Sequence, residues 1–312
     1  MKSVVFMGTP DFAVPALRVL IENSDYDVKL VISQPDKPQG RHQELTPPPV
    51  KQLALQYGLE MYQPETLKGD ETYEKLAAIN PDFIVVSAYG KILPKRILDI
   101  PKYGCVNLHG SLLPQYRGAA PIQWSVINGD KKTGVTTMLM DVGLDTGDIL
   151  LVSETEIGEE ETAGELFDRL AALCPDLLIK TLKALEEGSV TPVKQDEEKA
   201  TYVSMLSKEM AVIDWSDTAE NIHNKVRGMA PWPVAKTTYN SKLLKIFACK
   251  ITDKKYTGEQ GEVVVKDDEI FVICGNNSVI SITELQLEGS KRMKPADFLR
   301  GRGFEKGQKL GG

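Results

Sequence analysis

The alternation of apolar and polar residues divides the chain into a long first part and a shorter second part. In the first part, compact β-branched runs alternate with segments whose apolar residues recur every three to four positions. These patterns predict strands at Ser3–Met7, Val28–Ser33 and Phe83–Ser87, and helices at Asp11–Glu22, Pro49–Tyr57 and Asp70–Ile79. The alternation predicts an α/β fold, with a Rossmann-like, mostly parallel sheet covered by helices on both faces.

The later elements change character along the chain. A helix at 120–129, strands at 134–140 and 148–157 and a long amphipathic helix at Thr162–Glu187 complete a first domain, residues 1–188. Residues 189–206 are highly charged and lack a clear period, which is typical of a linker. A helix at Thr218–Gly228 then precedes five short strands, near 235–239, 243–251, 261–266, 269–274 and 279–286. We expect a C-terminal domain at 207–312 that forms a small β-barrel of the oligonucleotide-binding type.

Composition excludes several classes of protein. No apolar run approaches twenty residues, so we expect neither a signal peptide nor a membrane span. The four cysteines are widely spaced in apolar surroundings, which is typical of reduced core thiols in a cytoplasmic protein rather than a zinc or disulfide site. The first strand–helix turn, Gly8–Asp11, has one glycine, a proline and an aspartate, which disfavours a nicotinamide or flavin cofactor.

One of only three histidines, His109, ends a short apolar run two residues after Asn107. Side chains alternate along a strand, so both should point to the same face. Gly110 and Pro114 then form a turn, and ligands of open α/β sheets bind where such strands end. The pair is either a ligand-facing amide and imidazole or a hydrogen-bonded polar strand end, and the spacing alone leaves both open.

An acidic loop with two glycines, Asp141–Asp148, follows the apolar run Val135–Met140. Its aspartates do not have EF-hand spacing, and no glutamate closes the loop, which argues against calcium. Its glycines would allow positive φ and a close approach to a ligand. The loop is either a solvated turn or the source of an aspartate that fixes the tautomer and charge of His109.

Several motifs are shared with a known family. They are Asn107 and His109, the run Ser111–Pro121 (SLLPQYRGAAP), Asp141–Gly147, Gly8–Phe12, Gln34–Pro38, Gly40–Arg41, Ser87–Pro94 and Ala230–Pro233. With them the chain resembles the formyltransferases that use 10-formyl-tetrahydrofolate, and over nearly its whole length those that formylate methionyl-tRNA.

The resemblance implies transfer of a formyl group from 10-formyl-tetrahydrofolate to the amino group of initiator methionyl-tRNA, without a metal. The family's catalytic positions match Asn107, His109 and Asp145. Asn107 would donate to the formyl oxygen, His109 would donate or relay a proton, and Asp145 would orient the charged imidazole. The amine is itself a nucleophile, and Ser111 lacks the glycine-flanked elbow of a hydrolase.

The resemblance also implies a folate pocket. The matching positions lie in three segments: Ser87, Ala88, Tyr89, Gly90 and Ile92; Ser111, Leu112, Leu113 and Pro114; and Asp141, Val142, Gly143 and Leu144. Leu112 and Leu113 could equally be core residues.

Charge is unevenly distributed, which bears on a tRNA partner. Residues 207–312 carry 17 Lys and Arg against 14 Asp and Glu, although the net charge of the whole chain is −7. Lys291, Arg292 and Lys294 are candidate phosphate ligands, unless this tail is merely solvated. The long 34–49 loop is implied to contact the tRNA through Arg41, although Glu44 occupies a position where lysine can occur.

Two other functions remain open on the sequence. A formyltransferase acting on a small amine, such as a sugar nucleotide, would share the Asn, His and Asp set, but the basic C-terminal domain and the 34–49 loop argue against it. A non-catalytic RNA-binding module would not need that set. We expect a monomer in the cytoplasm.

Overall fold

The computed structural model describes residues 1–39 and 44–311, and the chain divides into two compact units. Unit 1 comprises residues 1–119, 133–155 and 167–203, and unit 2 comprises residues 120–132, 156–166 and 204–312. Within the described ranges, no helix is long and apolar enough to cross a membrane.

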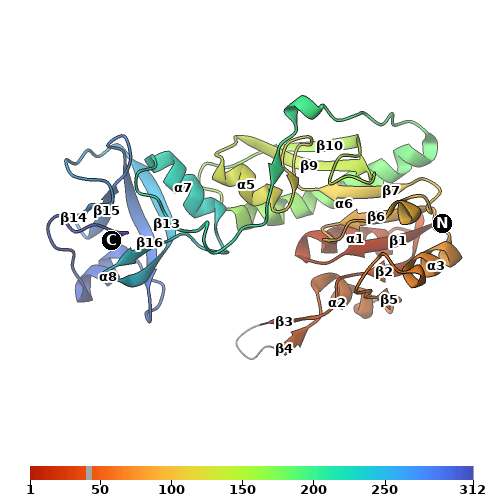
Figure 1. The fold of residues 1–312 in the computed structure, drawn as a ribbon, viewed down its shortest axis with the longest axis horizontal. Helices are drawn as coiled ribbons and strands as arrows, with labels where there is room; N and C mark the ends of the chain where they lie inside the picture. Colours follow the sequence, from red (N-terminus) through yellow and green to blue (C-terminus); the bar gives the residue numbers. More distant parts are fainter. Residues whose placement is uncertain (40–43, 312) are drawn as a thin grey trace. The chain divides into compact units, whose positions relative to one another are not determined.

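A seven-stranded sheet forms the centre of unit 1, in the order β10-β9-β7-β6-β1-β2-β5 (Figure 1). Four neighbouring pairs, from β7 to β5, are parallel, and β9 is antiparallel to β7. The strands are β1 (Lys2–Gly8), β2 (Tyr26–Ile32), β5 (Met61–Tyr62), β6 (Phe83–Ser87), β7 (Cys105–His109), β9 (Lys132–Leu139) and β10 (Asp148–Glu156). The central strands are buried along almost their full length, as expected for a sheet covered on both faces.

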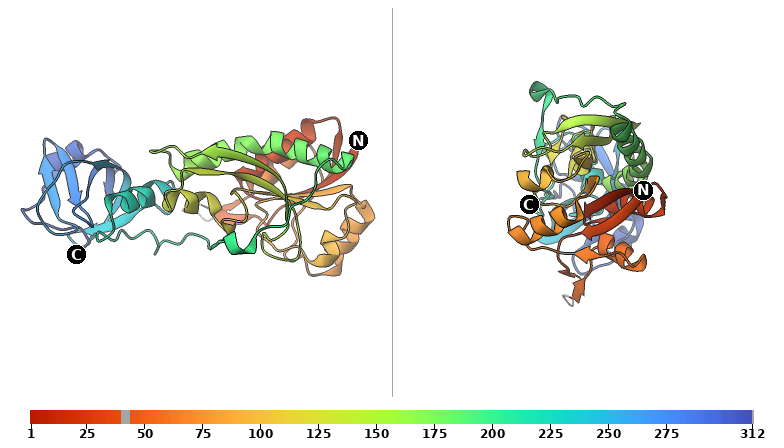
Figure 2. Two further views of the ribbon diagram at one scale, coloured as in Figure 1. Left: turned by 90° about the horizontal axis from the view of Figure 1, so that it is seen from above. Right: turned by 90° about the vertical axis from the view of Figure 1, so that its right-hand side faces the viewer.

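Helices cover both faces of this sheet (Figure 2). They are α1 (Val14–Glu22), α2 (Pro49–Gln56), α3 (Asp70–Ile79), α4 (Lys95–Leu98) and α6 (Ala163–Glu187), and the short helix η1 (Asp11–Ala13) precedes α1. On one face, Leu76 of α3 and Ile97 of α4 share a hydrophobic cluster with Val5 and Ile84. The long helix α6 begins with a capping box, because the Glu165 carboxylate accepts from the Thr162 backbone N–H at 2.9 Å.

The long 34–49 connection contains a β-hairpin that the hydrophobic pattern did not predict. Strand β3 (Lys37–Gln39) pairs antiparallel with β4 (Glu44–Thr46), and Lys37 lies opposite Thr46. The short strands carry polar and proline residues, so no alternation marked them. Arg41 falls between the two strands, outside the described residues.

The segment predicted to be a linker is attached to unit 1 over residues 189–203. Val193 bridges to Ile149, a short helix η2 (Glu197–Lys199) follows, and β11 (Tyr202–Val203) pairs with β8 (Arg117–Gly118). Backbone pairing of this kind leaves no periodic trace in the sequence, which explains why the segment resembled a free connector.

Unit 2 contains a five-stranded antiparallel sheet in the order β12-β13-β16-β15-β14 (Figure 1). Its elements are α5 (Pro121–Ile127), α7 (Ala219–Gly228), β12 (Lys236–Tyr239), β13 (Lys242–Thr252), β14 (Val263–Lys266), β15 (Glu269–Ile273), β16 (Val279–Leu287) and α8 (Pro295–Gly301). The predicted fold class, a mostly parallel α/β sheet followed by a small β domain, is confirmed.

Helix α5 belongs to unit 2, although it lies within the range assigned to the first domain from sequence. It packs on α7, and a Cβ on Gly228 would come within 2.5 Å of the Ile127 side chain. A boundary drawn along the sequence cannot show this close approach between helices that lie a hundred residues apart.

Candidate active site

Strand β7 places Asn107 and His109 on the same face, at the carboxyl end of the sheet. Asn107 lies opposite Val86 of β6 and Met138 of β9, and His109 lies opposite Thr136 of β9. Their exposed fractions are 7% and 6%. Among the residues that the structure describes, none accepts or donates a hydrogen bond to the Asn107 side-chain amide. The amide is therefore available to a ligand.

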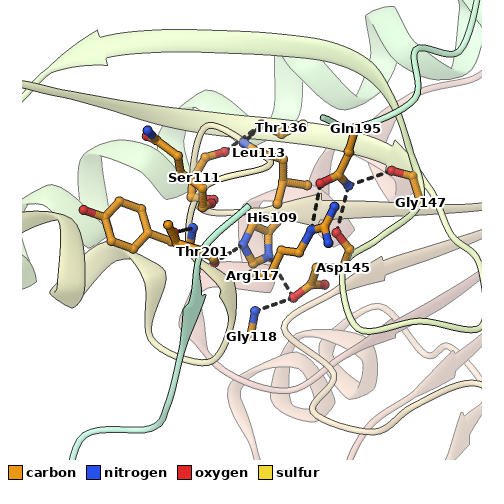
Figure 3. Close-up of polar contacts among 12 residues, drawn as sticks. His109, Ser111, Leu113, Arg117, Gly118, Thr136, Asp145, Gly147, Gln195 and Thr201 are labelled. Carbon is orange, nitrogen blue, oxygen red and sulfur yellow. Dashed lines mark hydrogen bonds and ion pairs between the residues drawn. The ribbon is translucent and has the colours of Figure 1, made fainter. Parts of the chain in front are cut away.

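His109 lies between a carboxylate and a carbonyl (Figure 3). Its Nδ1 lies 3.7 Å from Oδ2 of Asp145, and its Nε2 lies 2.9 Å from the backbone oxygen of Tyr116. A carbonyl oxygen only accepts, so Nε2 carries a hydrogen and Nδ1 takes the second proton. A proton added at Nδ1 therefore faces the Asp145 carboxylate, which stabilises the positive imidazole. This is the contact that the sequence left as one of two alternatives.

The glycines of the 141–147 loop have a different role from the one expected. Neither Gly143 nor Gly147 has a positive φ, whereas Asp145 has a φ of 54°. A Cβ on Gly143 would lie 1.9 Å from Thr146 Oγ1, and one on Gly147 would lie 2.0 Å from the backbone oxygen of Leu139. The glycines allow close packing within the protein, and the left-handed position is the aspartate itself.

Asp141 braces the same loop. Its Oδ1 accepts hydrogen bonds from the Gly143 backbone N–H at 3.0 Å and from the Thr146 hydroxyl at 2.6 Å. This carboxylate oxygen is thus already hydrogen-bonded within the loop. It acts as a structural brace for Val142 and Leu144, which the turn exposes.

Two of the three segments expected to bind folate expose large apolar side chains. Ile92, Val142 and Leu144 are 68%, 63% and 50% exposed. The loops that carry them start from one hydrophobic cluster, which includes Leu93 and the partly buried Met140. Exposed apolar side chains of this kind are suited to contact with a flat ring system.

The first of these segments also contains buried polar atoms without partners. The Ser87 and Tyr89 hydroxyls make no hydrogen bond with any described residue. Burial raises the pKa of the Tyr89 hydroxyl to about 12. Ala88 and Gly90 have φ values of 45° and 79°, so the backbone turns sharply here.

The Ser111–Pro114 run is part of the scaffold rather than an exposed surface. The Ser111 hydroxyl donates to the Gln115 backbone oxygen at 2.7 Å, and the Leu113 N–H donates to Thr136 Oγ1 at 3.2 Å. Ser111 and Leu113 are buried. The Leu112 side chain packs against Gly134, because a Cβ added to Gly134 would lie 2.7 Å from it. The core-packing alternative therefore fits the buried Leu113, while Leu112 is half-buried.

The sequence did not identify a second set of polar residues beside Asp145. Arg117 is fully buried and bonds to Gln195, Glu197 and Tyr202. Arg117 lies within the run that carried the family resemblance, but nothing in the sequence around Gln195 indicates a role.

The candidate tRNA-binding residues are not all equally available. Lys291 and Lys294 are exposed on unit 2 and form no ion pair with a described residue. Arg292 already forms an ion pair with Glu284, and its guanidinium lies 4.2 Å from the centre of the Phe247 ring.

Comparisons with known proteins place both halves of the chain in one class. The formyl transferase family matches residues 1–182, and the formyl transferase C-terminal domain matches residues 205–303. A solved structure of an N-formyltransferase from Helicobacter canadensis, with folinic acid and dTDP-3-aminofucose, has a TM-score of 0.68 over 90% of this chain and 99% of that one. At 19% sequence identity, this likeness concerns the fold alone.

Relatives that are more similar in sequence carry a more specific name. The methionyl-tRNA formyltransferase of Clostridium novyi (strain NT) is 50% identical over 97% of each chain. That of Bacillus subtilis (strain 168) is 49% identical over 100% of this chain and 98% of its own. The chain therefore belongs to the methionyl-tRNA formyltransferase family.

Proposed function

We propose that this chain transfers the formyl group of 10-formyl-tetrahydrofolate to the amino group of initiator methionyl-tRNA. The observation that carries the proposal is the pairing of the unengaged Asn107 amide with the His109–Asp145 pair at the end of β7. The full-length similarity to methionyl-tRNA formyltransferases supports the choice of acceptor.

The chemistry assigns a separate task to each of the three residues. As the amine attacks, negative charge develops on the formyl oxygen, and the Asn107 amide donates a hydrogen bond to it. His109, on the same face of β7 as Asn107, relays a proton between the attacking and the leaving nitrogen, while the Asp145 carboxylate orients the ring from its Nδ1 side. The Nε2–H of His109 is bound to the Tyr116 carbonyl, so direct transfer from Nε2 requires that bond to be exchanged.

No side chain is needed as a covalent nucleophile. The amine attacks the formyl carbon directly, the bond from that carbon to N10 of the folate breaks, and N10 gains a proton as the attacking nitrogen loses one, which gives formylmethionyl-tRNA and tetrahydrofolate. The Ser111 hydroxyl is already bound to a carbonyl. Cys105, two residues before Asn107, is also unsuited to attack because burial raises the pKa of its thiol to about 12.

The 87–94 and 141–147 loops fit the folate. Ile92, Val142 and Leu144 offer apolar contacts to its ring system, and the Ser87 and Tyr89 hydroxyls are unpaired polar groups in the same region. We assign Ser111, Leu112, Leu113 and Pro114 to the folate site as well. When bound, the folate supplies the activated formyl group.

The folate assignment predicts the effect of removing apolar contacts. Val142→Ser and Leu144→Ser should each raise the KM for 10-formyl-tetrahydrofolate by roughly 5-fold to 10-fold, because about 1 kcal/mol of apolar burial is lost. The KM for tRNA should stay within about twofold. Val152→Ser, at a 47% exposed valine on β10, is the matched control. Equal effects of all three changes on the KM for the folate would contradict the assignment.

Transfer RNA is assigned to Arg41 in unit 1 and to Lys291, Arg292 and Lys294 in unit 2. We assign catalysis to a domain of residues 1–188 and tRNA binding to residues 207–312, and we expect a cytoplasmic monomer. The 189–206 segment connects them in sequence, although residues 189–203 are also attached to unit 1.

The tRNA assignment predicts a change in salt dependence. Replacing Lys291 and Lys294 together with alanine should raise the KM for tRNA and reduce the magnitude of the log–log salt slope by about 1 to 2, because fewer counterions are released. Replacing Arg292 as well should add less, since that residue already has partners. A double change at the exposed Lys255 and Lys266 is the charge-matched control. An unchanged slope would mean that Lys291 and Lys294 lie on a solvated face.

The function itself is tested with three acceptors side by side. The chain and 10-formyl-tetrahydrofolate are incubated with initiator methionyl-tRNA, free methionine or a sugar amine, and formylated product is measured. We expect turnover with the charged tRNA only. Product from the sugar amine alone would assign the chain to small-amine formylation, and no product from any acceptor would indicate a non-catalytic module.

A further inference from the structure

Asp145 is held in a strained conformation by contacts on several sides (Figure 3). Its φ of 54° lies in the left-handed region, which disfavours residues with a Cβ. Its Oδ2 accepts from the Gly118 backbone N–H at 2.8 Å, and its backbone oxygen accepts from Gln195 Nε2 at 2.8 Å. These contacts direct the carboxylate toward His109.

Gln195 connects the loop to a buried arginine. Its Nε2 also donates to the Gly147 backbone oxygen at 2.7 Å, so one amide nitrogen holds two carbonyls of the 141–147 loop. Its Oε1 accepts from Arg117 Nε at 3.0 Å. An arginine can only donate, so this bond fixes which end of the amide faces the loop.

Arg117 is itself held firmly. Its guanidinium is fully buried and donates to both carboxylate oxygens of Glu197, at 2.9 and 2.8 Å, and to the Tyr202 hydroxyl at 2.8 Å. Arg117 also precedes Gly118, which binds the Asp145 carboxylate. Both residues of β8 therefore position Asp145. Gly118 binds its side chain directly, and Arg117 binds Gln195, which binds its backbone oxygen.

We infer that Gln195 and Arg117 are positioning residues for formyl transfer, which hold the Asp145 carboxylate at Nδ1 of His109. The expected effect on kcat rests on the proposed function. The expected effect on the position of the Asp145 carboxylate rests on the geometry alone. The groups that face the His109 ring nitrogens are the Asp145 carboxylate and the Tyr116 carbonyl, while the Arg117–Glu197 ion pair lies beyond Gln195.

The kinetic test uses Gln195→Met, which keeps the length of the side chain and removes the amide. We expect kcat to fall by roughly 10-fold to 100-fold, because displacing a catalytic group by about 1 Å has effects of this size. Both KM values should stay within about twofold. Glu198→Ala, at an exposed neighbour, should leave kcat unchanged. Gln195→Glu keeps an oxygen that accepts from Arg117, but its second oxygen cannot donate to the backbone oxygens of Asp145 and Gly147. It should therefore lower kcat as Gln195→Met does.

A double change separates positioning from general stability. In an Asp145→Asn background, Gln195→Met should cause less than a twofold further loss of kcat, since its effect acts through Asp145. The inference would be overturned if Gln195→Met lowered kcat by the same factor in the Asp145→Asn background as in wild type. It would also be overturned if both Gln195 variants were unfolded at the assay temperature and the loss of kcat followed from that.

A second readout needs no substrate. The imidazole nitrogen and carbon NMR shifts of His109, assigned by comparison with His109→Ala, report the surroundings of the ring. In Gln195→Met these shifts should change because the Asp145 carboxylate moves away from Nδ1, while those of His223 stay the same. If wild type formylates no acceptor but the shifts move as stated, the function fails and the positioning stands. Unchanged shifts together with unchanged kcat would overturn the positioning.

Discussion

Asn107→Ala and His109→Ala should each lower kcat by about 10²-fold to 10³-fold, with Asp145→Ala lowering it by 10²-fold or more. Loss of one preformed donor to a developing oxyanion typically has an effect of this size, as does loss of a group that transfers a proton. The Asn107 amide has no partner among the described residues, so it does not need to break a bond before donating. Single-turnover rates with initiator methionyl-tRNA measure the effect on the chemical step.

The effects of the three changes should not be independent. A double change at Asn107 and His109 should cost less than the product of the single effects, because both act on the same chemical step.

His223→Ala is the matched control for His109→Ala. His223 is also buried, at 6% exposed, and its Nε2 lies 3.4 Å from a carboxylate oxygen of Glu160. It lies on α7 in unit 2 and has no place in the proposed chemistry. Thermal midpoints of both histidine variants should shift by similar small amounts. Near wild-type kcat in all three site variants would show that the site is wrong.

The hydrophobic pattern predicted the regular elements well because burial leaves a period in the sequence. Phe83–Ser87 and Asp70–Ile79 have the predicted bounds, and the same-face placement of Asn107 and His109 follows from strand alternation alone. The elements that it missed are short and polar, such as the β3–β4 hairpin, where pairing rather than burial determines the structure.

The site was only partly predictable for a related physical reason. The residue types of the catalytic set appear in the sequence, but their distances depend on a loop that returns to the end of β7. Gln195 lies 50 residues from Asp145, and a single side-chain amide joining two carbonyls has no pattern along the chain. Likewise, the glycines of the loop suggested positive φ, whereas the backbone strain is carried by Asp145.

Arg41→Ala should lower kcat/KM for initiator tRNA by roughly 10-fold to 100-fold. Arg41 is the only arginine between Gln34 and Pro49, and a cation bonded bidentately to a base edge discriminates by about 1–3 kcal/mol. Circular dichroism and the thermal midpoint should barely change, because most substitutions away from a packed core contribute little to stability. Arg18→Ala, at an exposed arginine 3.8 Å from Glu22 on α1, is the matched control.

The carboxylate of Glu44, three residues after Arg41 in the sequence, predicts the opposite change. Glu44 is exposed at the start of β4, opposite Gln39, so its carboxylate opposes an approaching phosphate. Glu44→Lys should therefore tighten tRNA binding and reduce the preference for initiator over elongator methionyl-tRNA, since a nonspecific phosphate contact strengthens both. Kinetics with the two tRNAs, at two salt concentrations, measure the affinity and the ratio together. If Arg41→Ala formylates both at the wild-type ratio and rate, the hairpin loop does not read tRNA, and the C-terminal domain must supply the selectivity alone.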